Sequence, residues 1–103
     1  MYYTVATKMV VSSGTPAYTQ AVDMSGANGA MADIVVFTSA GGTARFQEGN
    51  DLENWSDAAS DAVLSATSFG TSKATAIASR YMRIKFTATS TMIVSAGINT
   101  AQL

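Results

Sequence analysis

A strict alternation of apolar and polar side chains near the C-terminal end is the sequence feature that most constrains the fold. In the stretch Tyr81–Thr87, which reads YMRIKFT, the apolar residues Met82, Ile84 and Phe86 are separated by two basic residues. Successive side chains of a β-strand point to opposite faces of a sheet, so a period of two separates a buried face from a solvated one. The stretch therefore predicts a strand with one side against a hydrophobic core.

Comparable patterns recur along the chain at intervals of about 8–12 residues, which is the spacing expected of a sandwich. Segments rich in Gly, Ser and Asn separate them and supply turns. A chain of 103 residues is long enough for one core and too short for two. We therefore predict a single all-β domain over 1–103, a two-layer antiparallel β-sandwich that is jelly-roll-like. Besides Tyr81–Thr87, the expected strands are Tyr2–Val11, Ala17–Asp23, Ala30–Thr38, Thr43–Gln47 and Met92–Thr100.

The stretch Thr43–Trp55 reads TARFQEGNDLENW and predicts a strand, a polar turn and a return to the core. The turn residues accept positive φ angles or bond their own backbone; they are Gly49, Asn50, Asp51 and Asn54. Trp55 is the only Trp of the chain and has about 200 Å² of ring surface to bury. We therefore expect Trp55 to anchor the core. The alternative is a platform on which a ligand stacks.

The segment that follows Trp55 allows two interpretations. Leu52, Trp55 and Ala59 begin a helical spacing, for which Asp51 is a possible cap. The high content of Ser, Thr, Ala and Gly instead suits a long connection with one strand around Val63–Ser68. We favour the connection with a strand and keep a short helical turn as the alternative.

Charged residues are scarce, and this bears on what the surface contacts. They make up 13% of the chain, half the usual share of about 25%, whereas hydrophobic residues make up 48%. The run IVVF within Ala30–Thr38 would make both faces of a strand apolar, and such strands are covered on both sides. We therefore expect a neighbouring subunit to cover this strand, with Val35 or Phe37, whichever points away from the core, in the contact.

The residue inventory disfavours several classes of function. The chain has no His and no Cys, so it lacks imidazole catalysts, thiolate nucleophiles and the usual zinc ligands. Its six basic and seven acidic residues are dispersed and give a net charge of −1, so no basic stripe is available for nucleic acid. We expect neither a secretion signal nor a membrane segment. The prediction is a protein that is not an enzyme, binds no cofactor or metal, and contacts neither nucleic acid nor membrane.

An acidic segment is the strongest local concentration of charge. Its members are Glu48, Asp51, Glu53, Asp57 and Asp61. Hard oxygen ligands of this kind bind calcium, but the sequence pattern of a helix-loop-helix calcium site is missing. We interpret the segment as a solvated acidic turn, with a calcium site as the alternative.

Interface residues are expected among the aromatic, apolar and basic side chains that a sandwich leaves outside its core. Tyr2 and Tyr3 are placed to reach a neighbouring subunit or to stack on a sugar. Arg83 occupies an outward position of its strand, where it could pair with an acidic group of a partner. The candidate interface therefore consists of Tyr2, Tyr3, Val35, Phe37 and Arg83, and no catalytic residue is assigned.

Two motifs in a fixed order carry a resemblance to known families. The first, QEGNDLENWSD, is a polar turn that leads into Asn54 and Trp55; the second is SRYMRIKF, which begins at Ser79. The pair resembles discoidin-type sandwich domains, in which such a turn leads to Asn-Trp and a later Arg-Tyr-Val-Arg strand packs near it. The chain is shorter and lacks the terminal cysteine pair and the ligand loop of those domains. The same motifs, with the segment Val22–Val36 and the final MIVSAGINTAQL, are similar to small proteins encoded among tailed-phage structural genes.

That second resemblance covers most of the chain and implies a mechanical function. The similar phage proteins are capsid decoration or cement proteins, small β-sandwiches that sit on the outer shell, often as trimers. The implied partners are the major capsid protein and further copies of the chain, and the implied location is the capsid surface of a virion assembled in the host cytoplasm. The alternative is a discoidin-like carbohydrate-binding module that uses Trp55 and the tyrosines to bind a glycan. A small hydrolase is disfavoured because no catalytic set is visible.

Overall fold

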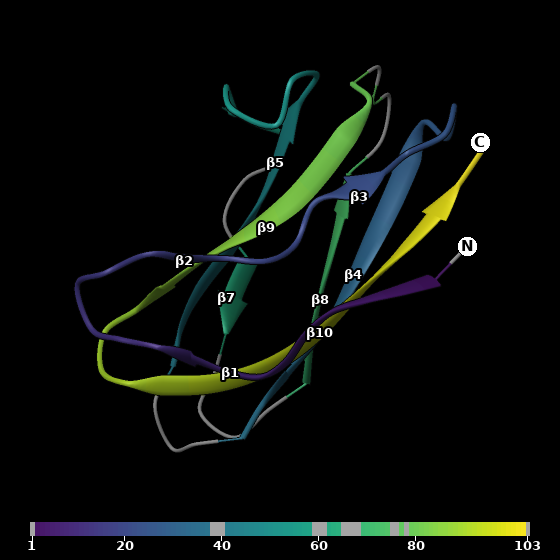
Figure 1. Cartoon of the computed structure of the whole chain (residues 1–103). Helices are drawn as coiled ribbons and strands as arrows, with labels where there is room; N and C mark the ends of the chain where they lie inside the picture. Colours follow the sequence, from purple (N-terminus) through teal and green to yellow (C-terminus); the bar gives the residue numbers. More distant parts are fainter. Residues whose placement is uncertain are drawn as a thin grey trace.

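The computed structural model describes residues 2–37, 41–58, 62–64, 69–74, 77 and 79–102, and all of its regular elements are strands in two sheets (Figure 1). The first sheet has the order β1 (Tyr2–Val11), β10 (Met92–Ala101), β4 (Gly29–Val36) and β8 (Phe69–Ala74). In the second sheet, β9 (Tyr81–Ala88) pairs on one side with β2 (Ala17–Tyr18) and β3 (Val22–Asp23) and on the other with β5 (Gly42–Gly49). The far edge of β5 pairs with β6 (Ser56–Asp57) and β7 (Ala62–Leu64).

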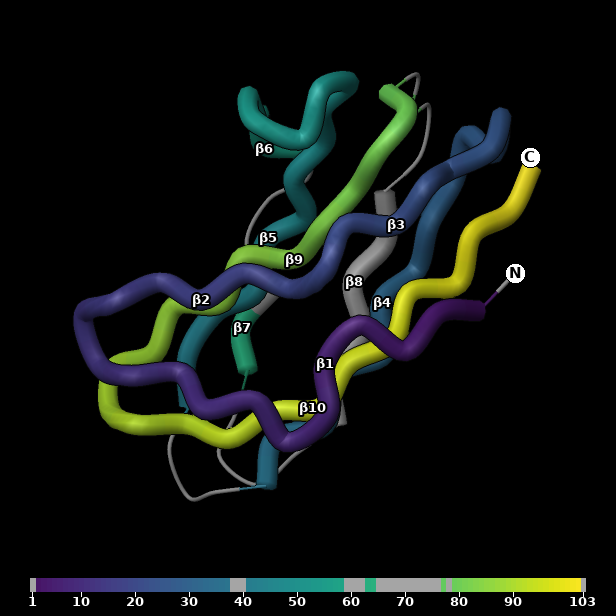
Figure 2. Tube along the Cα trace, viewed as in Figure 1, coloured from purple at the N-terminus to yellow at the C-terminus, as the bar shows by residue number. Residues whose placement is uncertain are grey.

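The path of the chain is that of a jelly roll. It starts in the first sheet with β1, crosses to the second for β2 and β3, and returns for β4. It then crosses back for β5 to β7, and the last three strands alternate between the sheets. Figure 2 shows the outcome, in which β1 and β10 run side by side and β9 lies beside β5. All strand pairs within the sheets are antiparallel, so the prediction of a two-layer antiparallel, jelly-roll-like sandwich is confirmed.

The core lies between the two sheets, where the alternating patterns place it. On β9, Met82, Ile84 and Phe86 are fully buried, as the alternation in this stretch predicts. On β10 the inward residues are Met92, Val94, Ala96 and Ile98. Ile34 and Val36 of the neighbouring strand β4 are buried beside them, and Phe46 of β5 is buried from the opposite sheet. Apolar burial of this extent is the main favourable contribution to folding.

Strand β1 differs from a regular strand because it contains a bulge. Its register with β10 shifts between Thr4 and Ala6 and again between Ala6 and Met9. Lys8 has a φ of 47°, and its backbone N–H donates to Ser95 Oγ at 2.8 Å. A bulge changes the phase of the strand, so the adjacent residues Val5 and Ala6 are both buried.

The predicted strand Ala17–Asp23 is interrupted in the middle by Thr19. Strand β2 ends at Tyr18, and Thr19 forms hydrogen bonds with β9 through its backbone N–H and its side-chain hydroxyl. Thr19 N donates to Ile84 O at 3.0 Å, and Thr19 Oγ1 accepts the Ile84 N–H at 2.9 Å. Thr19 is 7% exposed. A hydroxyl thus replaces the backbone carbonyl that a continuous ladder would supply, and β3 resumes the pairing at Val22.

The region after Trp55 contains short strands, and none of the described residues there is helical. The strands β6 and β7 continue the sheet along the outer edge of β5. The favoured strand is therefore present at Val63 and Leu64, whereas residues 65–68 and Asp61 lie outside the described residues. No helix of the length and apolar character needed to cross a membrane occurs in the described part of the chain.

Candidate functional site on the outer face of the second sheet

A stacked arginine occupies the outer face of the second sheet. Arg83 points outward because its neighbours on β9, Met82 and Ile84, point into the core. Its guanidinium carbon lies 4.1 Å from the ring centroid of Tyr18 and 4.3 Å from that of Trp55. Tyr18 comes from β2, on the opposite side of β9 from Trp55. We call these three residues the arginine stack; both distances are well within the range of cation–π attraction.

The position of Trp55 corrects the expectation that it anchors the core. Trp55 is half-buried and lies outside the cluster of core residues. The register explains why: Gln47 pairs with Asp57 and Glu48 with Ser56, so Trp55 comes opposite Gly49 on the outward side of β5. Gly49 has no side chain, and a Cβ built there would lie 3.4 Å from Trp55 Cε3. The ring thus packs beside Gly49, where the backbone oxygen of Asn54 leaves no room for a side chain.

A chain of hydrogen bonds holds the arginine stack on the sheet. Arg83 Nε donates to Gln47 Oε1 at 2.9 Å, and Gln47 Nε2 donates to Asp57 Oδ1 at 3.4 Å. Asp57 Oδ2 accepts from Arg45 Nη1 at 2.7 Å. The hydrogen bonds from Arg45 and Gln47 lower the pKa of Asp57. Partial burial lowers the pKa of Arg83 from its ordinary value.

The polar turn beyond β5 is braced by Asp51. Its Oδ1 accepts the backbone N–H groups of Glu53 at 3.0 Å and Asn54 at 2.8 Å, and its Oδ2 accepts Asn54 Nδ2 at 2.7 Å. These bonds lower the pKa of Asp51 to about 2. Leu52 sits at the tip, 51% exposed, with a φ of 65° that Leu rarely adopts.

The acidic residues of this region are engaged separately and do not converge. Glu48 accepts the Ser79 hydroxyl at 2.7 Å, Asp57 pairs with Arg45, and Asp51 bonds its own turn. Among the described residues, no group of three acidic side chains could hold a metal ion together. Glu48, Asp51 and Asp57 thus each bond a neighbouring protein group.

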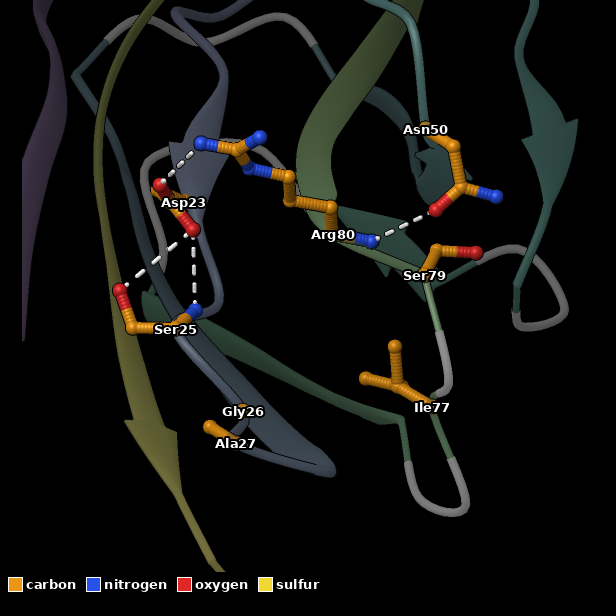
Figure 3. Close-up of a pocket in the computed structure, with 8 residues that line it drawn as sticks. All are labelled: Asp23, Ser25, Gly26, Ala27, Asn50, Ile77, Ser79 and Arg80. Carbon is orange, nitrogen blue, oxygen red and sulfur yellow. Dashed lines mark hydrogen bonds and ion pairs between the residues drawn. The ribbon is translucent and has the colours of Figure 1, made fainter.

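Two shallow pockets lie at the end of the sandwich beside this turn. The larger, of about 530 Å³, contains an ion pair between Asp23 and Arg80 at 3.6 Å (Figure 3). Asp23 also accepts the backbone N–H of Ser25 at 3.0 Å, and Arg80 N donates to Asn50 Oδ1 at 3.0 Å. The smaller pocket, of about 330 Å³, is lined by Trp55 together with Glu48, Gly49, Asn50, Asp51, Asn54, Ser56 and Ser79. The charges of the larger pocket neutralise each other, whereas the smaller combines one aromatic ring with several polar groups.

The remaining candidate interface residues lie on the other side of the molecule. Val35 on β4 and Phe37, which directly follows β4, both point away from the core, because Ile34 and Val36 point inward. Phe37 is 47% exposed, and Val35 is half-buried. The structure thus places Arg83 on one outer face and this pair on the opposite one.

The two tyrosines of β1 have different surroundings. Tyr2 is 54% exposed and lies over Gly97, which has no side chain to displace it. Tyr3 is half-buried opposite Ile98 and packs against the core cluster, so it does not share the outer face with Tyr2. Alternation explains the difference, because Tyr3 shares the inward face with its buried partner.

An apolar row on the first sheet was not identified from the sequence. It consists of Val10 on β1, Ile93 on β10 and Phe37 beside β4. Val10 pairs with Ile93, and Phe37 N donates to Ile93 O at 2.9 Å, so the three lie across adjacent chains. Val10 is 58% exposed, and Lys8 Nζ lies 5.9 Å from the Phe37 ring centroid. Of the three, the sequence had pointed to Phe37 alone; the signal for the others is the unbroken apolar run around Val10, which does not fit a strand with one solvated face.

Comparisons with known proteins establish the fold and no family. No protein-family model matches the chain, and no curated protein sequence matches it. Among solved structures, the crystal structure of PBSX exported protein XepA is similar over 100% of this chain, with a TM-score of 0.79 and 11% sequence identity. The chain spans 37% of the length of that protein. The likeness at this identity is one of fold.

Proposed function

We propose that this protein is a structural component of a phage particle, a capsid decoration or cement protein that binds the outer shell and stabilises contacts between capsomers. Two independent likenesses support the proposal. The fold is shared with an exported protein of phage PBSX. The motifs around Trp55 and Arg83 resemble those of small decoration proteins. The proposed partners are the major capsid protein and other copies of the chain.

The observation that carries the proposal is the division of interface-type residues between the two outer faces. A protein that bridges neighbours needs two separate contact surfaces, one for each side. The apolar row is on the first sheet, and the arginine stack is on the second. Exposed apolar, Tyr, Trp and Arg side chains are enriched in protein interfaces. A ligand-binding module would need only one such surface.

The direct test uses particles produced from the strain that carries the gene. Mass spectrometry of density-purified particles is expected to detect the protein in defined stoichiometry with the shell protein. Particles that lack the gene product are expected to release DNA at a lower temperature, and added purified protein is expected to restore their resistance. Absence of the protein from purified particles would overturn the proposal.

Self-association through the first sheet is tested separately by light scattering across a concentration series. We expect a defined oligomer, with a trimer as the form that the decoration proteins suggest. Phe37→Ser is expected to shift the protein towards monomer, because it removes the largest apolar side chain from the apolar row. Val63→Ser is the matched control, since Val63 is 80% exposed and lies on β7, away from that row. Equal effects of the two variants would argue against the apolar row as the contact.

A second candidate function, glycan binding, is favoured by the exposure of Trp55. The ring borders a pocket of about 330 Å³ that also presents Asn50, Asp51 and Asn54. Sugar sites combine an aromatic stacking surface with a few polar groups in this way. Retention of the protein on immobilised polysaccharide, lost in Trp55→Ala, would support this function. No retention on a broad panel would exclude it.

A further inference from the structure

We propose that the arginine stack is a docking site for a carboxylate side chain of a protein partner, with Arg83 making the contact and Tyr18 and Trp55 holding it in place. This inference names the chemistry of one partner surface. It rests on the proposed function only in treating the partner as a protein. It depends otherwise on the geometry of the second sheet alone.

The guanidinium of Arg83 is held in position but incompletely paired. Its Nε is bonded to Gln47, whereas Nη1 and Nη2 have no hydrogen-bond acceptor among the described residues. Two aromatic rings within 4.3 Å limit its motion. Arginine presents its donors as a planar fork that matches a carboxylate in two parallel bonds. A fork whose Nε is fixed and whose end is open is therefore organised in advance for such a ligand.

The acidic residue nearest in the network does not complete the site. Asp57 is already bound to Arg45 at 2.7 Å and reaches Arg83 only through Gln47. Lys85, two residues along β9 on the same face, forms no ion pair within the described chain. Among the described residues of the outward face of β9, Arg83 and Lys85 are thus two cations that no carboxylate pairs. The excess positive charge favours an acidic ligand.

The surroundings favour a protein as the source of the carboxylate. Trp, Tyr and Arg are the residue types most enriched in the energetic centres of protein interfaces, and all three are in contact here. The stack lies on the surface of a sheet, and Tyr18 is 45% exposed at its edge. The neighbouring pocket that Trp55 lines also contains Glu48 and Asp51, whose negative charges disfavour an acidic sugar there.

The test uses the full chain and the fluorescence of Trp55, which reports on the stack because it is the only Trp. The probe is a hexaglutamate peptide, with hexaglutamine as the uncharged control and polygalacturonate as the acidic sugar. We expect hexaglutamate to change the fluorescence saturably, with an affinity that falls as salt is raised. Arg83→Lys keeps the charge but loses the fork, and is expected to weaken binding by about tenfold or more.

Arg80→Gln is the control for net charge. Arg80 directly precedes β9, lies outside the arginine stack and is paired with Asp23. It is expected to change hexaglutamate affinity by less than about threefold. Thermal melts confirm that each variant is folded before binding is measured.

Several results would overturn the inference. Weakening by Arg80→Gln with no weakening by Arg83→Lys would mean that only the overall charge matters. Equal binding of hexaglutamine would show that the carboxylate is not recognised, and tighter binding of polygalacturonate would assign the site to a sugar. No fluorescence response to hexaglutamate at millimolar concentration would show that the arginine stack does not bind carboxylates. None of these results affects whether the protein is found in phage particles, so the proposed function is tested independently.

Discussion

Replacing Thr19 by Val tests whether a single side-chain hydroxyl maintains the pairing at the edge of the second sheet. Thr19 Oγ1 accepts the Ile84 N–H at 2.9 Å in a buried setting, and Val has nearly the same shape without the oxygen. The variant leaves the Ile84 N–H buried and unpaired, which costs about 1–3 kcal/mol. The added methyl group offsets up to about 0.8 kcal/mol of this cost. We therefore expect a net loss of about 1–2 kcal/mol in the free energy of unfolding.

The assay is urea unfolding followed by Trp55 fluorescence, with a thermal melt as a second measurement. For a domain of this size, each kcal/mol lowers the melting temperature by about 4–8 °C. The slope of the unfolding free energy against urea is expected to stay unchanged, because the exposed surface is the same. The Ile84 amide is also expected to exchange hydrogen faster than in the wild type.

Thr87→Val is the matched control, since Thr87 is an exposed residue of β9, the strand that also contains Ile84. Its effect is expected to stay within about 0.5 kcal/mol. A Thr19→Val protein as stable as the Thr87→Val protein would refute the reasoning. It would mean that water or a backbone shift satisfies the Ile84 N–H at no cost.

Three further predictions concern other parts of the molecule. Gly42→Ala is expected to cost about 1–3 kcal/mol in thermal or urea unfolding, because its Cβ would meet the backbone of the neighbouring strand. Gly97→Ala should be milder, since only the exposed Tyr2 ring must move, and an equal loss would contradict this. The pKa of Asp51 is lowered from 3.8 to about 2 in the folded protein, so its contribution to stability is complete above pH ~4 and is lost as the pH falls towards 2. Asp51→Asn should therefore make the free energy of unfolding depend less on pH in that window. An unchanged pH profile would show that the turn bonds contribute nothing. Phe37→Ser, unlike Val63→Ser, should reduce self-association in light scattering, and at a protein concentration at which the wild type is monomeric it should leave the melting temperature unchanged.

The elements that sequence reasoning predicted best are those in which one periodicity continues over a whole strand. The patterns of β9 and β10 each continue for about eight residues, and both strands are buried on the predicted side. The interruption at Thr19 was not predictable, because a threonine in an edge strand looks the same whether or not its hydroxyl joins the ladder. The bulge near Lys8 has no composition signal either, since its positive φ occurs at a residue that seldom adopts one.

The candidate site was only partly visible in the sequence, because it depends on register between strands far apart in the chain. Arg83 and Trp55 were each singled out, but Trp55 was assigned to the core because its large apolar ring favours burial. Which face it takes depends on its position relative to Gly49, and a turn one residue longer would reverse it. Tyr18 joins the stack only through the pairing of β2 with β9, which no local pattern specifies.

The pairing of β1 with β10 determines how this molecule responds to mechanical force. The start of β1 lies beside the end of β10, with Tyr2 opposite Asn99 and Val11 opposite Met92. The hydrogen bonds between antiparallel strands lie perpendicular to them. A pull that separates these neighbouring ends is therefore directed along the bonds and breaks them one after another, like a zipper. A pull between the two outer faces is instead shared by the whole core. The protein is therefore expected to resist force weakly when it is pulled at these strand ends and strongly when it is pulled at its two outer faces.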